Sequence, residues 1–317
     1  MISTNLLYVV IGLIVLVWSA DRFVQGAVVV ADTFKIPPLL IGMLIIGFGT
    51  SAPEIVVSIL AAINNTPGIA LGNAYGSNIA NISLILGITA LISPVIVQPE
   101  VLKKELLILI GFTFLTIGLL WDLELSRYDA YLLLGAFGLF IIISIVTAKK
   151  EQSDATPPEW SLTKAIVWTA VGLILLIISS RLLVYGAVNV ATQLGVSNLV
   201  IGLTIIAIGT SLPELASSIV AARKGEHELV FGNIIGSNLF NTMVVVGLAG
   251  VIQPVVADQT IVTRDLSFIT LLTLSLLVMG YHYGRSKTGR INRWEGGLLL
   301  LSYIVYSLYL LSTVTTT

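Results

Sequence analysis

Two copies of one six-residue motif carry the side chains that could do chemistry. The chain reads Gly-Thr-Ser-Ala-Pro-Glu at residues 49–54 and Gly-Thr-Ser-Leu-Pro-Glu at residues 209–214. Each copy places a glutamate and a proline inside a long apolar segment. An ionisable group inside a membrane segment is energetically costly, so Glu54 and Glu214 are candidate functional residues. Matching sites in two halves of one chain favour a transporter whose ion site lies where the halves meet.

The prolines make backbone oxygens available beside the glutamates. Proline has no N–H and its ring clashes with the carbonyl four residues earlier, so Pro53 frees the carbonyl of Gly49. Pro213 does the same for Gly209. Freed carbonyls at mid-membrane are tolerated only when they are buried in protein or bound, and a cation satisfies them. Together with the threonine and serine of the motif, each copy offers hard oxygen ligands around one carboxylate.

A second polar face follows each motif. Asn73, Ser77 and Asn81 recur every four residues and therefore share one face of a helix. The second half repeats them at the same spacing as Asn233, Ser237 and Asn241. If the two halves come together, the glutamates would face one another among serine, threonine and asparagine oxygens. For the asparagines, purely structural hydrogen bonding between helices is the alternative interpretation.

The ligand types favour Ca²⁺ or Na⁺. Ca²⁺ takes six to eight oxygen ligands in flexible geometry, whereas Mg²⁺ demands an octahedron and keeps its waters. Transition metals would favour histidine or thiolate, but the chain has no cysteine, and its two histidines, His227 and His282, lie near predicted loops. Two ionised glutamates carry about −2 charge, which one Ca²⁺ neutralises and which three Na⁺ would leave near +1.

Composition shows what kind of protein holds these motifs. Of 317 residues, 56% are hydrophobic and 10% are charged, whereas soluble domains carry about 25% charged residues. The chain is therefore predicted to be an integral membrane protein in contact with the lipid bilayer. The lack of cysteine excludes disulfides and thiol redox chemistry. We expect no cofactor, no nucleic-acid partner and no protein partner.

Hydropathy predicts ten membrane-spanning helices. A span needs roughly 20 apolar residues, and such segments lie at Leu6–Thr33, Pro38–Ile63, Ile69–Ile92, Glu105–Leu120, Tyr128–Ala148, Leu162–Gln193, Leu199–Ala222, Leu229–Ile252, Leu266–Tyr283 and Trp294–Leu311. The first and sixth are longer than a perpendicular span requires, which indicates tilt. A polar stretch with two prolines separates the halves, so we expect repeats at 1–150 and 162–317, joined by a linker at 151–161 in one membrane domain.

The halves are related by an internal repeat. A shift of 160 positions aligns the second half with the first without a gap, and the matches cluster in the second and third helix of each half. Five helices is an odd number, so the two halves would enter the membrane from opposite sides as an inverted repeat. The expected fold is an all-α membrane protein of ten helices, with helices two, three, seven and eight broken around a central ion site.

Basic residues predict the orientation. Loops on one side hold twelve lysines and arginines, whereas loops on the other side hold only Arg127 and Arg264. Cytoplasmic loops carry the excess of basic residues. Both termini are therefore expected outside and the central linker in the cytoplasm.

The two motif pairs resemble the alpha-repeats of the calcium/cation antiporter superfamily. The size of the chain and the lack of a large cytoplasmic loop make it most similar to prokaryotic sodium/calcium exchangers, which implies a multi-pass protein of a prokaryotic plasma membrane. The resemblance covers the whole ten-helix layout and is most specific at residues 41–94 and 201–254. It also implies that helices one and six slide as a pair across the other eight.

The resemblance implies a ligand set. Glu54 and Glu214 would bind Ca²⁺ with the backbone carbonyls of Thr50 and Thr210. The flanking Na⁺ sites and the middle of the cluster would be formed by Ser51, Ser211, Ser77, Ser237, the carbonyls of Gly47 and Ala207, and Asn81 with Asn241. Potassium-dependent relatives carry an aspartate at the position of Asn241, so K⁺ co-transport is not expected.

The sequence leaves several functions open. The expected function is a secondary active antiporter that exchanges Na⁺ for Ca²⁺ across the plasma membrane by alternating access. A proton/Ca²⁺ antiporter on the same scaffold and a cation channel are the alternatives. An enzyme is not expected, because no nucleophile or phosphate loop accompanies the glutamates. A structural interpretation pairs the glutamates with the intramembrane Arg22 or Arg181, although Asp21 is a nearer partner for Arg22.

Overall fold

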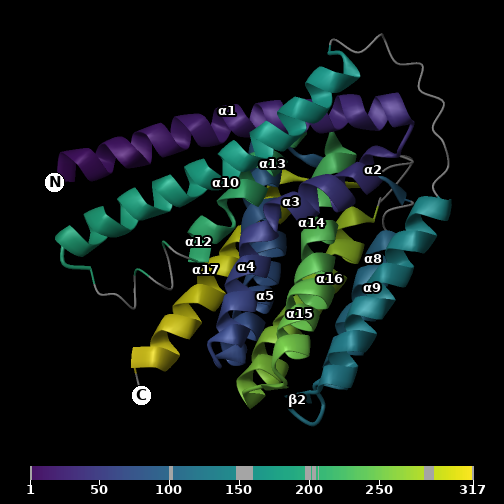
Figure 1. Ribbon diagram of the computed structural model, residues 1–317, viewed down its shortest axis with the longest axis vertical. Helices are drawn as coiled ribbons and strands as arrows, with labels where there is room; N and C mark the ends of the chain where they lie inside the picture. The colour runs from purple at the N-terminus through teal and green to yellow at the C-terminus, as the bar shows by residue number, and fades with distance from the viewer. Residues whose placement is uncertain are drawn as a thin grey trace.

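The computed structural model describes residues 2–99, 103–147, 160–196, 201, 205, 207–281 and 289–315. Within these ranges the protein is helical apart from two short strand pairs (Figure 1). Seven described helices are long and apolar enough to cross a membrane, or eight if the bent pair at 38–63 counts as one span. Two further expected spans correspond to a shorter apolar helix at 105–119 and to a helical segment that the structure describes from residue 207.

The first half contains the following elements: α1 (Ile2–Phe34), α2 (Pro38–Ile41), η1 (Gly42–Gly47), α3 (Phe48–Thr50), α4 (Ala52–Ile63), α5 (Pro67–Ile79), η2 (Ala80–Ile85), α6 (Leu86–Ile92), β1 (Val95–Val97), α8 (Glu105–Leu119), β2 (Glu124–Leu125) and α9 (Arg127–Thr147). The second half contains α10 (Leu162–Gln193), α12 (Ala207–Thr210), α13 (Leu212–Arg223), α14 (His227–Leu239), η4 (Phe240–Val245), α15 (Val246–Ile252), β3 (Val255–Val256), η5 (Ile261–Leu266), α16 (Ser267–Gly280), β4 (Gly289–Ile291) and α17 (Arg293–Thr315). The η segments are π-helical.

The long helices α1 and α10 form an antiparallel pair that crosses the other helices at a steep angle (Figure 1). Glycines bring their backbones together: a Cβ added at Gly12 would lie 2.8 Å from the Cβ of Leu183, and one added at Gly172 would lie 2.9 Å from the nitrogen of Phe23. A shift of 160 maps Gly12 on Gly172 and Phe23 on Leu183. The contact is therefore reciprocal, as expected of small-residue crossings in membranes.

The second helix of each half is broken at its motif, as predicted. Ser51 separates α3 from α4, and the helix axis bends by 47° there. Ser211 separates α12 from α13 in the same way. In both cases a proline occupies the second position of the new helix, where its missing N–H is tolerated.

The prediction that helices three and eight are broken is wrong. Residues 67–92 and 227–252 are continuous helical spans. Each instead contains a π-helical segment, η2 or η4, and these segments are also 160 residues apart. Pro67 occupies the first position of its span and no proline lies further inside either span, so the backbone ladder continues with one wider turn.

The two halves are interlocked at both ends. Strand β1 pairs with β4 and β2 pairs with β3, so each short sheet joins one strand from each half. The fifth helix of each half also packs on the third helix of the other: α17 contacts η2 and α6, and α9 contacts η4 and α15. These short strands are an addition to the expected all-α fold, because segments of two or three residues are too short to show a strand pattern in sequence.

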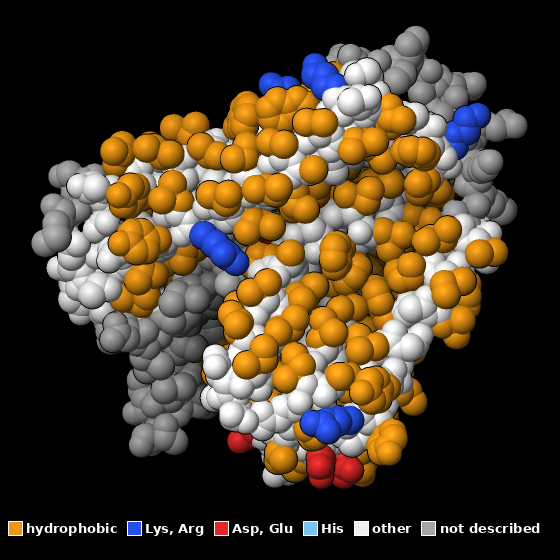
Figure 2. Space-filling model, in the orientation of Figure 1, with side chains coloured by type: hydrophobic (Ala, Val, Ile, Leu, Met, Phe, Trp, Pro, Cys, Tyr) orange, Lys and Arg blue, Asp and Glu red, His pale blue; other side chains and the backbone are white. Residues whose placement is uncertain are grey.

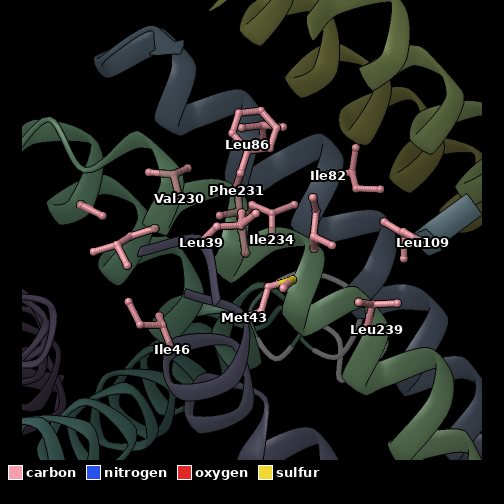
Figure 3. Close-up of a cluster of buried hydrophobic side chains, with 14 of the residues drawn as sticks. Leu39, Met43, Ile46, Ile82, Leu86, Leu109, Val230, Phe231, Ile234 and Leu239 are labelled. Carbon is pink, nitrogen blue, oxygen red and sulfur yellow. The ribbon is translucent and has the colours of Figure 1, made fainter. Parts of the chain in front are cut away.

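The core lies where the halves meet. Figure 3 shows Leu39, Met43 and Ile46 of the second helix packed beside Val230, Phe231 and Ile234 of α14. The outer surface is also apolar, and Figure 2 shows hydrophobic side chains across its face, with basic groups near the upper edge, one basic group at the left of the face, and basic and acidic groups together near the lower edge. An apolar exterior between charged ends is what a bilayer requires.

Candidate functional site

The two motif copies meet in the interior. Glu54 is 1% exposed and Glu214 is 2% exposed. The two carboxylates lie close to each other, and Glu214 also lies near Thr50 and Ser51 of the first half. Glu54 lies near the hydroxyl of Ser77. The structure therefore brings together the glutamates that are 160 residues apart in sequence.

Local sequence places each glutamate at the start of a helix. Glu54 lies in the first turn of α4 and Glu214 in the first turn of α13. The positive end of the helix dipole favours a negative charge at this position. The helix break thus exposes backbone polar groups and supports a carboxylate at the same place.

Two asparagines of the third and eighth helices clamp the backbone of the motifs. The side-chain amide of Asn73 donates to the carbonyl oxygen of Glu54 (3.1 Å) and to the hydroxyl of Ser58 (3.0 Å). The amide of Asn233 donates to the carbonyl oxygen of Glu214 (3.2 Å) and to the hydroxyl of Ser218 (2.8 Å). These asparagines position the glutamates through the backbone, which the sequence pattern did not reveal.

Hydrogen bonds also cross between the halves. The Thr50 hydroxyl donates to the side-chain oxygen of Asn233 (3.3 Å), and the Ser237 hydroxyl donates to the carbonyl oxygen of Gly47 (3.4 Å). Thr50 is fully buried, as is Ser237. The carbonyl of Gly47 and the hydroxyl of Ser237, which the resemblance placed among the ligands of the flanking Na⁺ sites, are therefore adjacent.

A second set of cross-half bonds lies next to the π-helical segments. The Asn81 amide donates to the side-chain oxygen of Asn238 (3.2 Å), and the Asn78 amide donates to the hydroxyl of Thr242 (2.8 Å). Sequence reasoning did not select Asn78, Asn238 or Thr242. The available signal was the repeated Gly-Ser-Asn, which places Asn78 and Asn238 at equivalent positions.

Several buried oxygens of the cluster make no hydrogen bond of acceptable geometry. Three pairs related by the repeat are among them: the hydroxyls of Ser51 and Ser211, carboxylate oxygens of Glu54 and Glu214, and the side-chain oxygens of Asn81 and Asn241. A buried oxygen without a partner costs about 1–3 kcal/mol. A cation satisfies such oxygens together, so the donor set fits a hard metal ion such as Ca²⁺ or Na⁺.

The remaining candidate residues lie around this cluster. Thr210 and Ser77 line a cavity of about 210 Å³ together with Asn73 and residues of α17. Ala207 is the first residue of α12, and its side chain lies outside the described part of the structure.

The alternative of an intramembrane ion pair finds no support in the described part of the chain. The salt bridges there do not include Glu54 or Glu214. Arg22 lies over the ring of Trp18. The expected pairing of Asp21 with Arg22 is also wrong, since Asp21 forms an ion pair of 2.9 Å with Lys224 on the far side of a helix interface.

The fold and the buried cluster define a multi-pass helical membrane protein with an oxygen-rich interior site between repeated segments. The family model described as sodium/calcium exchanger protein matches residues 4–146 and 164–312. The chain therefore belongs to the sodium/calcium exchanger family, within the calcium/cation antiporters.

Individual relatives agree over nearly the full length. The chain is 45% identical to the putative antiporter CaxA of Alkalimonas amylolytica, covering 97% of this chain and 98% of the relative. It is 29% identical to the sodium/calcium exchanger MaX1 of Methanosarcina acetivorans, covering 96% and 98%. A structure of the sodium-calcium exchanger NCX_Mj, soaked without Na⁺ and Ca²⁺, matches with a TM-score of 0.85 at 32% identity and covers 96% and 98% of the two chains.

Proposed function

We propose that the protein is a secondary active antiporter that exchanges Na⁺ for Ca²⁺ across a prokaryotic plasma membrane by alternating access. The observation that carries this proposal is the set of three repeat-related pairs of buried oxygens without hydrogen-bond partners. Membership of the exchanger family supports cation/Ca²⁺ antiport, and sodium is the coupling ion named for the relative MaX1.

We assign the ligands as follows. The carboxylates of Glu54 and Glu214, with the carbonyls of Thr50 and Thr210, bind one Ca²⁺ and are neutralised by it. The flanking Na⁺ ligands are Ser51, Ser211, Ser77, Ser237 and the carbonyls of Gly47 and Ala207, and Asn81 and Asn241 lie at the middle of the cluster. The adjacency of Gly47 and Ser237 supports one flanking site. Ions of either kind compete for the same two charges, so occupancy by one favours release of the other.

The topology that we propose for this antiporter is a ten-helix inverted repeat. The halves at 1–150 and 162–317 are joined by a cytoplasmic linker at 151–161, and both termini lie outside. Two features support it. The glycine contacts between α1 and α10 are reciprocal under the 160-residue shift. The pairing of β1 with β4 and of β2 with β3 requires each pair of loops to share one side of the membrane, as the alternation of ten spans demands.

A flux assay tests the proposal. Proteoliposomes loaded with Na⁺ should take up ⁴⁵Ca²⁺ when external Na⁺ is absent. This uptake should stop when the sodium gradient is removed. Uptake that ignores sodium but follows a pH gradient would instead establish the proton/Ca²⁺ antiporter. Uptake that continues without any counter-ion would indicate a channel.

Two substitutions test the site. Glu54→Gln and Glu214→Gln keep the shape of the side chain and remove its charge. Losing one partner of a buried charge pair costs about 2–5 kcal/mol, so Ca²⁺ transport should fall by at least roughly 30-fold. Glu124→Gln, at an exposed position of strand β2, is the matched control and should transport normally. If both buried variants exchange Ca²⁺ at the wild-type rate, the ligand assignment is wrong.

A further inference from the structure

One carbonyl that a motif proline leaves without its helical donor is bonded to a different helix. Pro213 lies four residues after Gly209 and cannot donate to the Gly209 carbonyl. The hydroxyl of Ser180 on α10 donates to this oxygen at 2.9 Å. Ser180 is 4% exposed, so bulk water does not compete for the bond. The bond therefore ties α10 directly to the broken helix that carries Glu214.

The neighbouring serine shows that this contact is selective. Ser179 is 2% exposed, and its hydroxyl donates to the carbonyl oxygen of Leu176 in its own helix at 3.0 Å. The repeat-related Ser19 donates in the same way to Leu16 at 3.1 Å. Position 180 corresponds to Ala20, which has no hydroxyl. Only the second half can therefore make the inter-helix bond at this position.

The packing around this bond also involves α10 in both halves. Both motif glycines lie against α10: a Cβ added at Gly49 would meet Leu173, and one added at Gly209 would meet Val184. On the other side of the pair, α1 is joined to the end of α13 by the ion pair of Asp21 with Lys224. The α1–α10 pair is thus fastened at two points in the arrangement that the structure shows.

Movement of the pair must break the Ser180 bond. A helix rises about 5.4 Å per turn, so a shift of α10 by one turn carries the hydroxyl out of reach of the Gly209 carbonyl. A groove of about 460 Å³ lies beside this bond, and its lining includes Ser180, Gly209 and Thr210. The released carbonyl would face this groove next to a proposed ligand.

We propose that Ser180 is a positioning residue that couples the position of α10 to the backbone of the ion site. Its hydroxyl holds the Gly209 carbonyl while α10 is in the observed position and releases that carbonyl when α10 slides. The proposal rests on the proposed alternating-access function and adds to it a contact that only one half possesses. Loss of the hydroxyl should therefore bias the protein away from the observed arrangement.

A distance measurement between spin labels tests this inference. Val17 and Arg223 both line a groove between α1 and α13 and leave the Asp21–Lys224 pair intact. The chain has no cysteine, so Val17→Cys with Arg223→Cys gives two unique labelling sites. Removing one net hydrogen bond should lower the ratio of the short-distance to the long-distance population roughly two- to tenfold in Ser180→Ala.

Matched variants decide the result. Ser179→Ala should leave the ratio unchanged, and Ser180→Thr, which keeps the hydroxyl, should restore it. Equal ratios in Ser180→Ala and Ser179→Ala would overturn the inference, as would a Thr variant that behaves like Ala. The populations are measured without transport, so a wild-type protein lacking sodium-dependent flux would refute the proposed function and leave this test valid.

Discussion

The close packing of α14 against the second helix, at α2 and η1, can be tested with one pair of glycines. Gly72 and Gly232 are 160 residues apart and occupy the same position in α5 and α14. A Cβ at Gly232 would clash with the carbonyl oxygen of Leu39 and lie 2.7 Å from the Cα of Gly42. A Cβ at Gly72 would have nothing within 4 Å. The two Gly→Ala variants therefore differ only in how the added methyl group packs against its neighbours.

The expected magnitudes follow from these geometries. Alanine gains about 1 kcal/mol over glycine inside a helix, and this gain applies to both variants. Overpacking against a rigid neighbour costs about 1–3 kcal/mol, and it applies to Gly232→Ala, where the clashing atoms belong to the backbone. The free energies of unfolding should therefore differ by about 1–3 kcal/mol, with Gly72→Ala the more stable.

Thermal unfolding in detergent measures this difference. With about 2.1 cal/mol/K of unfolding entropy per residue over 317 residues, 1 kcal/mol corresponds to about 1.5 °C. Gly232→Ala should thus melt roughly 1.5–5 °C below Gly72→Ala. A Gly232→Ala protein as stable as the Gly72 variant would show that the helices do not approach as closely as described, and would refute the reasoning.

Two further predictions concern the end of the molecule that carries the α13–α14 turn. Asp21→Asn should destabilise the docking of α1 on α13 by about 0.2–1 kcal/mol, because the ion pair with Lys224 is partly exposed; a double-mutant cycle with Lys224→Gln that gives no coupling energy at low salt would contradict this. Burial and the nearby Asp32 raise the pKa of Glu226 above its usual value, so its contribution to stability is present below pH 4.5 and lost as the pH rises through the raised pKa. Glu226→Gln should therefore raise the melting temperature at neutral pH and leave it unchanged in acid, and an equal effect at both pH values would contradict the assignment.

The features that followed from sequence are those with a local cause. Pro53 and Pro213 fix the helix breaks, because a missing N–H acts within one turn whatever the fold around it. The sixth span was predicted at Leu162–Gln193 and is observed as α10 with the same bounds. The repeat also predicted that Glu54 and Glu214 would meet, since equivalent residues approach one another when two halves pack around an axis.

The features that did not follow from sequence depend on tertiary contacts. Asn73 appeared only as one member of a polar face, whereas its amide holds the backbone of Glu54. Helices three and eight were predicted to be broken, whereas each is continuous and contains a π-helical segment, η2 or η4, that the sequence pattern did not reveal. The difference between Ser180 and Ala20 was visible in the aligned halves. It gained meaning only when the structure showed which face of α10 meets Gly209.

The exchange of fifth helices between the halves has a consequence for biosynthesis. Helix α9 ends at Thr147, and its partner α15 begins at Val246, about 100 residues later. At about 5–20 residues per second, the ribosome needs roughly 5–20 s to produce that partner. During this interval α9 must wait in the bilayer with its packing face against lipid. The first half can therefore reach its final packing only after the second half has been made, so the two repeats mature as one unit.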